Sequence, residues 1–354
     1  MRAAVLIGYI LVPLFGVYMC IGPLVTRPTV QFGVRVPPGY TTAPVIRRER
    51  RSYRWRSAVI AICAMAALIA WGARGSWWPS RLALGVEVAA DLGCFWWAHQ
   101  RITRVKSAEG WFAGRRQTVV ADTSWRARPE GFPIGWLLLA AAVIVATVVV
   151  GILRYPHLPP YLSRSSHRVT TSPASAFAVV FGQMYATAMW AGLLALVYRS
   201  RPDLDTADPV ASLRGYRKAR GAFARAALVM LACVDLSGLL ASLRLWQVFS
   251  PPGVWNVLVL LPVVLGLVAF LVTVVRAGAA RERTSGGAAT DRDDDRFWKA
   301  GIMYLNRGDP AVLVSARLAM GWTVNLGNPT AWLLIGGFVA VPAGLVAIML
   351  ATGI

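Results

Sequence analysis

The chain has 354 residues, of which 56% are hydrophobic and only 15% are charged. Soluble domains average roughly 45–50% apolar and about 25% charged residues, so this composition excludes an ordinary soluble protein and favours a membrane protein. The formal net charge of +21 would suggest a nucleic-acid partner in a soluble chain. The positions of the charges give a different explanation.

Apolar stretches long enough to cross a bilayer recur along the whole sequence. A transmembrane helix needs roughly 17–25 predominantly apolar residues. We predict about eight transmembrane helices in an all-α integral membrane protein, over residues 3–25, 57–73, 81–98, 133–153, 175–198, 225–245, 254–275 and 331–352.

The basic residues alternate between the connections of these spans. Thirty of the 37 Lys and Arg residues lie in loops 26–56, 99–132, 199–225 and 276–330. Cytoplasmic loops carry an excess of Lys and Arg, so we predict these four loops inside and both termini outside, in a bacterial cytoplasmic membrane. The charge is then mainly a topology signal, with anionic lipid headgroups as partners and no direct nucleic-acid binding.

This topology divides the chain into three parts. Residues 1–275 form a membrane domain of seven spans with three basic cytosolic loops, residues 276–330 a cytosolic element, and residues 331–354 the final span. The four cysteines all fall within spans and form no C-x-x-C, so they predict neither a disulfide nor a metal site.

The cytosolic element is predicted to have a small α+β fold assembled with other inner loops. Aspartates before "RFWKAGIMYL" (296–305) predict a short helix that begins near Asp294. "AVLVSAR" (311–317) and "GWTVNLG" (321–327) predict a hairpin of two strands. So small a hairpin is unstable alone, and we expect it to pack on "QTVVADT" (117–123).

Several motifs together resemble a known family. They are "FGVRVP" (32–37), "KSAEGW" (106–111), "VVADTSW" (119–125), "YPHLP" (155–159) and the tail "FWKAGIMYLNRGDPAVLVSARLAMGWTVNLGNP" (297–329). The chain looks like the uncharacterised bacterial multi-pass membrane proteins related to SdpI-type immunity and signalling proteins. The tail is the most specific part of this resemblance.

One outer loop departs from the family pattern. Relatives carry an "hFNxxGxPDxW"-like stretch after "YPxLP", whereas this chain has "YLSRSSHRVTTSPASAF" at residues 161–177. The resemblance therefore implies a topology and a setting in signalling, with a cytosolic regulator as partner. It does not imply the same external ligand.

Three acidic residues fall within predicted spans. Glu87 and Asp91 are four residues apart and share one helix face, and Asp235 lies near the middle of the sixth span. A charge at the bilayer centre costs roughly 2.5–3.5 kcal/mol, so each needs a partner, a proton or water. One hypothesis is a proton- or cation-linked polar site. The other is interhelical hydrogen bonding with Gln183, Thr187, Ser237 or Ser242 as partners.

The tail offers candidate docking residues for a cytosolic protein. Its aromatic rings could anchor a partner, or they could pack the tail's own small core. The candidate docking residues are Trp298, Lys299, Tyr304, Asn306, Asp309, Arg317, Trp322 and Asn325.

Motifs of catalysis and of metal binding are absent from the sequence. There is no H-E-x-x-H, G-x-S-x-G, Walker loop or G-x-G-x-x-G, and the aspartates of 291–295 lack EF-hand spacing. We therefore expect no catalytic residue, no cofactor and no metal. The leading hypothesis is a receptor or immunity-type signalling protein without catalytic activity. The alternative is a proton- or cation-linked transporter or channel using Glu87, Asp91 and Asp235.

Overall fold

The structure is a computed structural model that describes residues 2–26, 29–72, 78–111, 131–164, 167–200, 209–249, 254–284, 294–317 and 321–351. The chain divides into two compact units. Unit 1 comprises residues 1–129, 200–219 and 275–328, and unit 2 comprises residues 130–199, 220–274 and 329–354. Each unit is described by itself.

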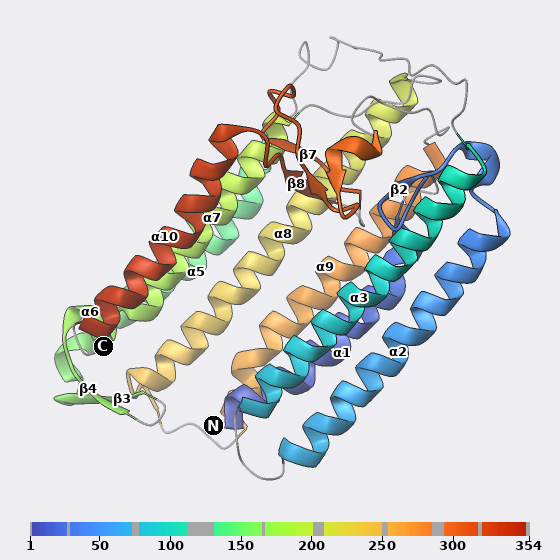
Figure 1. Cartoon of the computed structure of the whole chain (residues 1–354). Coiled ribbons are helices and arrows are strands. Elements are labelled where there is room, and N and C mark those ends of the chain that lie inside the picture. The colour runs from blue at the N-terminus through green and yellow to red at the C-terminus, as the bar shows by residue number, and fades with distance from the viewer. Residues whose placement is uncertain are drawn as a thin grey trace. The chain divides into compact units, whose positions relative to one another are not determined.

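Each of the eight predicted apolar stretches is helical over most of the residues that the structure describes, with Pro133, Phe177 and Val254 as exceptions (Figure 1). The helices are α1 (Arg2–Val25), α2 (Pro44–Gly72), α3 (Trp78–Ala108), α5 (Ile134–Arg154), α7 (Ala178–Arg199), α8 (Pro209–Leu245), α9 (Trp255–Thr284) and α10 (Pro329–Ala351).

Five of these helices, α2, α5, α7, α8 and α9, are long and apolar enough to cross a membrane within the described part of the chain. The prediction of a mostly helical chain with several helices long and apolar enough to cross a membrane is confirmed, and the count of eight spans stays a prediction. The described apolar parts of α1 and α10 are shorter, Val12–Pro23 and Pro329–Ala340. Helix α3 carries Arg81, Glu87 and Asp91 within its apolar stretch, which lowers its hydropathy.

In unit 1, helices α1, α2 and α3 pack against one another, and the hairpin of β1 (Val30–Gln31) and β2 (Val34–Arg35) covers one end of α3. The turn of this hairpin is Phe32–Gly33, with φ angles of 48° and 74°. The Phe32 ring lies 5.2 Å from Tyr53 of α2 and 5.9 Å from Phe95 of α3 between centroids. An apolar core therefore joins the β1–β2 hairpin to both helices.

Unit 1 also contains the polar element, which we define as residues 294–317 and 321–328. It consists of η4 (Asp295–Phe297), β5 (Trp298–Lys299), β6 (Met303–Tyr304), β7 (Leu313–Ser315) and β8 (Trp322–Val324). The predicted hairpin is confirmed, because β7 pairs antiparallel with β8. The proposed packing partner, residues 117–123, lies outside the described residues.

The predicted helix over 296–305 is wrong. Asp294 does cap a helical start, since its side chain accepts from the Arg296 N–H, but only the single 3-10 turn η4 follows. Ala300 and Gly301 have φ angles of 54° and 74°, which turn the chain into the antiparallel β5–β6 pair. The helical spacing of the apolar residues gave no sign of this chain reversal. A glycine with positive φ commonly allows such a reversal.

In unit 2, small residues allow close packing of α5, α7 and α8. Its apolar core consists of Ala140, Leu194, Ala224, Ala227, Leu228, Leu231 and Ala232. Small side chains let helices approach closely where no hydrophobic effect drives association, as in a bilayer. The loop that departs from the family pattern forms the hairpin β3 (Tyr161–Arg164) and β4 (His167–Thr170), followed by the short helix α6 (Pro173–Ala176). Trp246 is fully buried here and donates from Nε1 to the Ala176 carbonyl at 2.9 Å.

Candidate functional site

The two acids of α3, which we call the acid pair, are completely buried. Glu87 and Asp91 are each 0% exposed, on one face of α3 that packs against α1 and α2. By distance and angle neither carboxylate has a hydrogen-bond partner among the residues that the structure describes, although the Ser57 hydroxyl of α2 lies close to Asp91. A buried polar group without a partner costs free energy, so these two residues do not stabilise the packing of α3.

The surroundings of the acid pair are small and apolar. A Cβ added to Gly16 of α1 would come within 3.2 Å of Glu87 Oε1, so α1 lies close against this carboxylate. A cavity of about 360 Å³ between α2 and α3 is lined by Glu87 together with Cys63, Val86 and other apolar side chains. Among the described residues, Glu87 is the only acid that lines it. The cavity is large enough for several waters or a hydrated ion.

Asp235 of α8, in unit 2, has a different environment. It is also 0% exposed, but its Oδ2 accepts a hydrogen bond of 3.0 Å from the Thr187 hydroxyl of α7. Gln183 of α7 donates from Nε2 to the Asp235 backbone carbonyl at 2.7 Å. Oδ1 has no partner among the described groups. Of the four hydrogen-bond partners considered from the sequence, Gln183 and Thr187 are thus present. Asp235 takes part in joining α7 to α8.

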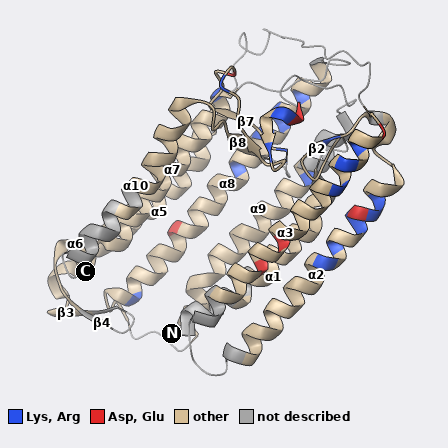
Figure 2. Cartoon of the chain, viewed as in Figure 1, with Lys and Arg blue, Asp and Glu red and all other residues tan. Residues whose placement is uncertain are grey.

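A joint site of Glu87, Asp91 and Asp235 stays a prediction. The acid pair belongs to unit 1 and Asp235 to unit 2. Figure 2 shows acidic residues within α3 and α8, and Lys and Arg residues gathered at the end of α2 and of α3 near β2.

The large aromatic rings of the polar element mostly form its own core. Trp298 is 5% exposed and Tyr304 is 0% exposed, and their ring centroids lie 5.1 Å apart. Val314 of β7 completes this core. Trp322 is half-buried, with its ring edge towards Tyr216 of α8 at 6.4 Å between centroids. Among the candidate docking residues, Lys299 remains exposed.

Asn325 holds the loop 306–311 of the polar element together. Its Nδ2 donates to the carbonyls of Asn306, Asp309 and Ala311 at 2.9, 3.0 and 3.1 Å. Its Oδ1 accepts from the N–H groups of Asn306 and Gly327, both at 3.0 Å. Asn325 is fully buried, so these hydrogen bonds replace the water that its side-chain amide would otherwise bind.

Tyr304, Asn306 and Asp309 form a second layer of hydrogen bonds. The Tyr304 hydroxyl donates to Asp309 Oδ2 and accepts from Asn306 Nδ2, each at 3.1 Å. Asp309 Oδ1 accepts from the Ala311 N–H at 3.0 Å. Four of the candidate docking residues therefore stabilise the loop from within.

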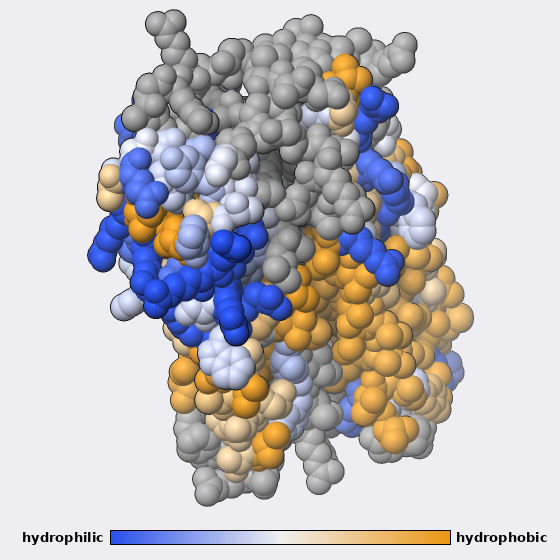
Figure 3. Space-filling view, turned by 90° about the vertical axis from the view of Figure 1, so that its right-hand side faces the viewer, coloured by the Kyte–Doolittle hydropathy of each residue, from blue (hydrophilic) through white to orange (hydrophobic). Residues whose placement is uncertain are grey.

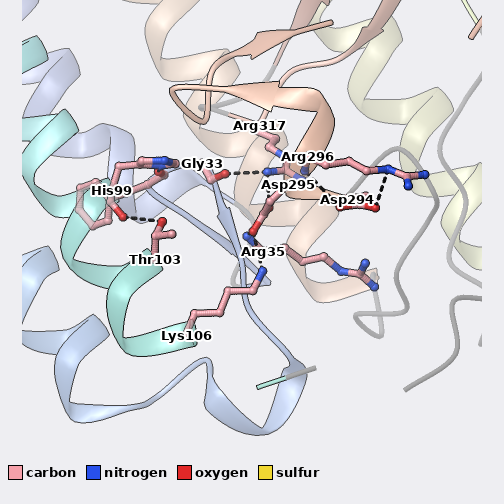
Figure 4. Close-up of polar contacts among 10 residues, drawn as sticks. Gly33, Arg35, His99, Thr103, Lys106, Asp294, Asp295, Arg296 and Arg317 are labelled. Atoms are coloured by element: carbon pink, nitrogen blue, oxygen red, sulfur yellow. Dashed lines mark hydrogen bonds and ion pairs between the residues drawn. The ribbon is translucent and has the colours of Figure 1, made fainter. Parts of the chain in front are cut away.

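Asp295 connects the polar element to the rest of unit 1 (Figure 4). Its carboxylate contacts Lys106 Nζ of α3 at 2.5 Å and Arg317 Nη1 at 2.6 Å, and accepts from the Arg35 N–H of β2 at 3.1 Å. Arg317, whose side chain is 2% exposed, also donates to the Gly33 carbonyl at 2.7 Å. Its guanidinium lies 4.7 Å over the Trp298 ring. Two cationic side chains and one backbone N–H, from three separate segments, thus meet at one carboxylate.

The β1–β2 turn at Gly33 and the β5–β6 turn at Gly301 are in contact near Asp295. A Cβ on Gly33 would overlap the Gly301 carbonyl and Cα, and a Cβ on Gly301 would lie 2.7 Å from His99 Nδ1. The same His99 nitrogen is 2.9 Å from the Phe32 carbonyl. Only glycine provides both the positive φ and the space for such an approach. The end of α3 therefore contacts both the β1–β2 turn and the β5–β6 turn.

The sequence motifs identified the segments of this site but not the contacts between them. "FGVRVP" (32–37) and the tail were recognised separately, and the structure places their turns in contact. Asp295 was interpreted as one of several helix-start aspartates, and His99 was not considered for the tail. Asp291 and Asp293 lie outside the described residues.

Comparison with known proteins gives one match. A family described as "Family of unknown function (DUF5808)" matches residues 307–332, which cover Asp309, Trp322, Asn325 and the start of α10. No curated protein and no solved structure matches the chain. The match lies in the loop that Asn325 holds, β7, β8 and the beginning of α10. It supports the resemblance to an uncharacterised family, and none of the comparisons links the chain to SdpI.

Proposed function

We propose that the chain is a multi-pass receptor of the bacterial cytoplasmic membrane, an immunity-type or signalling protein without catalytic activity. In this proposal the acid pair within α3 responds to an event in the membrane, and the polar element presents the response to a cytosolic regulator. Both termini lie outside. The relation to SdpI-type proteins is part of this proposal and rests on the resemblance of the motifs.

The observation that carries the proposal is that one helix bears both sites. Asp91 and Lys106 are fifteen residues apart on α3, about 22 Å along a helix axis. At one position the helix carries buried carboxylates without described partners, and at the other it holds His99 and Lys106 against the polar element. Protonation, ion binding or a bound ligand that shifts α3 would change these contacts.

The four basic loops support the proposed sidedness. Asp295 contacts loop 26–56 through Arg35 and loop 99–132 through Lys106, and Trp322 packs on Tyr216 of loop 199–225. Segments that are separated by membrane spans can make these contacts only if they share one side. The excess of Lys and Arg then favours the cytosol as that side.

The docking surface that we propose differs from the one expected from the sequence, because Trp298, Tyr304 and Asn325 are buried. Met303 of β6 and Leu305, which follows β6, lie on either side of the buried Tyr304 in the chain and are 45% and 40% exposed. Lys299 and Arg307 are exposed beside them in the chain. An apolar centre with basic neighbours suits a partner with an apolar and acidic surface.

Co-purification from native membranes tests the proposal. We expect the full chain to capture a cytosolic protein, Leu305→Asp to lose it, and Glu87→Gln to change the captured amount. The matched control is Val210→Asp, which places the same charge at an exposed apolar residue of α8. If Leu305→Asp and Glu87→Gln leave the captured proteins and their amounts unchanged, the proposal is wrong.

A proton- or cation-linked transporter is the second candidate. It is favoured by the cavity of about 360 Å³ that Glu87 lines and by the missing partners of both carboxylates. Flux into proteoliposomes that Glu87→Gln abolishes and Asp235→Asn only reduces would support transport. Flux that survives both substitutions would exclude the use of these acids.

A further inference from the structure

The first turns of α2 carry a basic groove that the proposed receptor function does not use. It has a volume of about 1000 Å³ and is lined by Cys20 of α1 and by residues of α2. The α2 residues are Arg47, Arg48, Arg51, Ser52, Arg54, Trp55 and Ala58. We call it the arginine groove.

The guanidinium groups of the arginine groove are not neutralised within the described residues. Arg47, Arg48, Arg51 and Arg54 are exposed, and no described carboxylate pairs with them. The nearest acid in sequence, Glu49, is buried on another face of α2 and pairs with Arg101 of α3 at 3.3 Å. Four like charges in one groove repel one another unless an anion lies between them.

An apolar face continues directly from the groove along α2. Trp55 is 72% exposed, and Val59, Ile62 and Ile69 follow it at helical spacing with exposures of 40%, 67% and 60%. Trp55 and Ile69 are fourteen residues apart, about 21 Å along the helix, which exceeds the roughly 15 Å of hydrocarbon in one leaflet. In Figure 3, hydrophilic residues gather over one end of the face shown and hydrophobic residues cover the part below.

We infer that the arginine groove binds the headgroup of one anionic phospholipid, whose acyl chains lie along the apolar face of α2. Guanidinium groups match phosphate oxygens through paired N–H donors. An indole at the boundary between them is typical of the headgroup zone of a membrane. A free phosphate would use the arginines alone, whereas a phospholipid also uses Trp55 and the apolar face, which is why we favour the lipid.

The test is native mass spectrometry of the full chain in detergent, titrated with phosphatidylglycerol or phosphatidylcholine. We expect phosphatidylglycerol to bind preferentially at one equivalent. The triple variant Arg47→Gln, Arg51→Gln, Arg54→Gln should lose about a hundredfold in affinity, since each basic residue near an anionic surface contributes about a factor of five.

A matched control separates this site from bulk charge. Arg104→Gln, Arg214→Gln, Lys218→Gln removes the same charge from exposed positions outside the groove and should retain binding. The variant Arg47→Lys, Arg51→Lys, Arg54→Lys keeps the charge and serves as a second variant in case the glutamine triple variant does not fold. We expect it to lose about tenfold in lipid affinity, because lysine lacks the paired N–H donors of arginine.

Any of three results, or the retained binding described below, would overturn the inference. They are equal losses in the glutamine triple variant and its control, equal binding of phosphatidylcholine and phosphatidylglycerol, and complete displacement of the lipid by millimolar inorganic phosphate. The last result would assign the groove to a soluble phosphate. Retained binding in the glutamine triple variant would likewise exclude the groove.

Discussion

The polar element and the middle of α3 differ in how far their buried polar groups are satisfied by hydrogen bonds. Asn325 makes five hydrogen bonds and Asp295 contacts three cationic or N–H groups. Glu87 and Asp91 are buried to the same degree or more, and by distance and angle neither makes a hydrogen bond among the described residues. Satisfied polar groups specify a fold, whereas unsatisfied ones cost stability and are expected at sites with another use.

Asp235 shows that burial in a helix does not by itself create an unsatisfied acid. Thr187 and Gln183 of α7 reach its side chain and its backbone carbonyl. The environment of the acid pair differs from this: Gly16 of α1, which has no side chain, lies against Glu87, and Ser57 of α2 is the polar neighbour of Asp91. The following substitutions test this difference, from the largest expected effect to the smallest.

The largest effect is expected from Asn325→Ala. The substitution leaves several buried N–H and carbonyl groups without a partner, at about 1–3 kcal/mol each, so the polar element should lose about 3 kcal/mol or more of its free energy of unfolding. Hydrogen exchange of residues 294–317 in the full chain measures this loss. Asn328→Ala, which removes the half-exposed contact with the Pro310 carbonyl, should cost about 1 kcal/mol and serves as the control.

Gly33→Ala tests the contact between the two turns. The new Cβ would overlap Gly301, and the φ of 74° is unfavourable for any other residue, so we expect about 2 kcal/mol of destabilisation. Gly39→Ala is the matched control, because nothing lies within 4 Å of its added Cβ. Equal thermal unfolding temperatures for the two variants would show that the turns do not pack in this way.

Asp295→Asn weakens the link between the polar element and α3. Asp295 is one-third exposed, and solvent screens its ion pairs, so we expect a loss of about 1–2 kcal/mol that shrinks at high salt. Asp294→Asn affects only the cap and the exposed pair with Arg296 and should cost less than about 1 kcal/mol. A loss for Asp295→Asn that is independent of salt would contradict the ionic contribution.

Glu87→Gln should have the smallest effect on stability and the opposite sign. Replacing an unpaired carboxyl group with an amide removes the ionisable group from apolar surroundings, so we expect stabilisation of about 1 kcal/mol together with loss of function. Asp235→Asn keeps an oxygen for Thr187 and should leave stability nearly unchanged. A destabilised Glu87→Gln variant would indicate that Glu87 has a structural partner.

The sequence predicted the helices well and the polar contacts poorly. Continuous apolar stretches located the eight long helices of the described residues, because helix formation depends on local composition, and "AVLVSAR" with "GWTVNLG" located β7 and β8. The pairing of Asp295 with Lys106, 189 positions earlier, has no local signal. Neither has the approach of Gly33 to Gly301. For Trp298 the sequence left docking and packing in the tail's own core open, and the structure shows Trp298 packed with Tyr304 and Val314.

The most direct test of coupling through α3 is hydrogen exchange of residues 294–317 in the full chain in lipid nanodiscs. We predict that Glu87→Gln with Asp91→Asn changes the protection of these residues, whereas Asp235→Asn does not. Gly33→Ala shows whether the assay detects a loosened polar element. Unchanged protection in the double variant, in an assay that detects Gly33→Ala, would contradict the account.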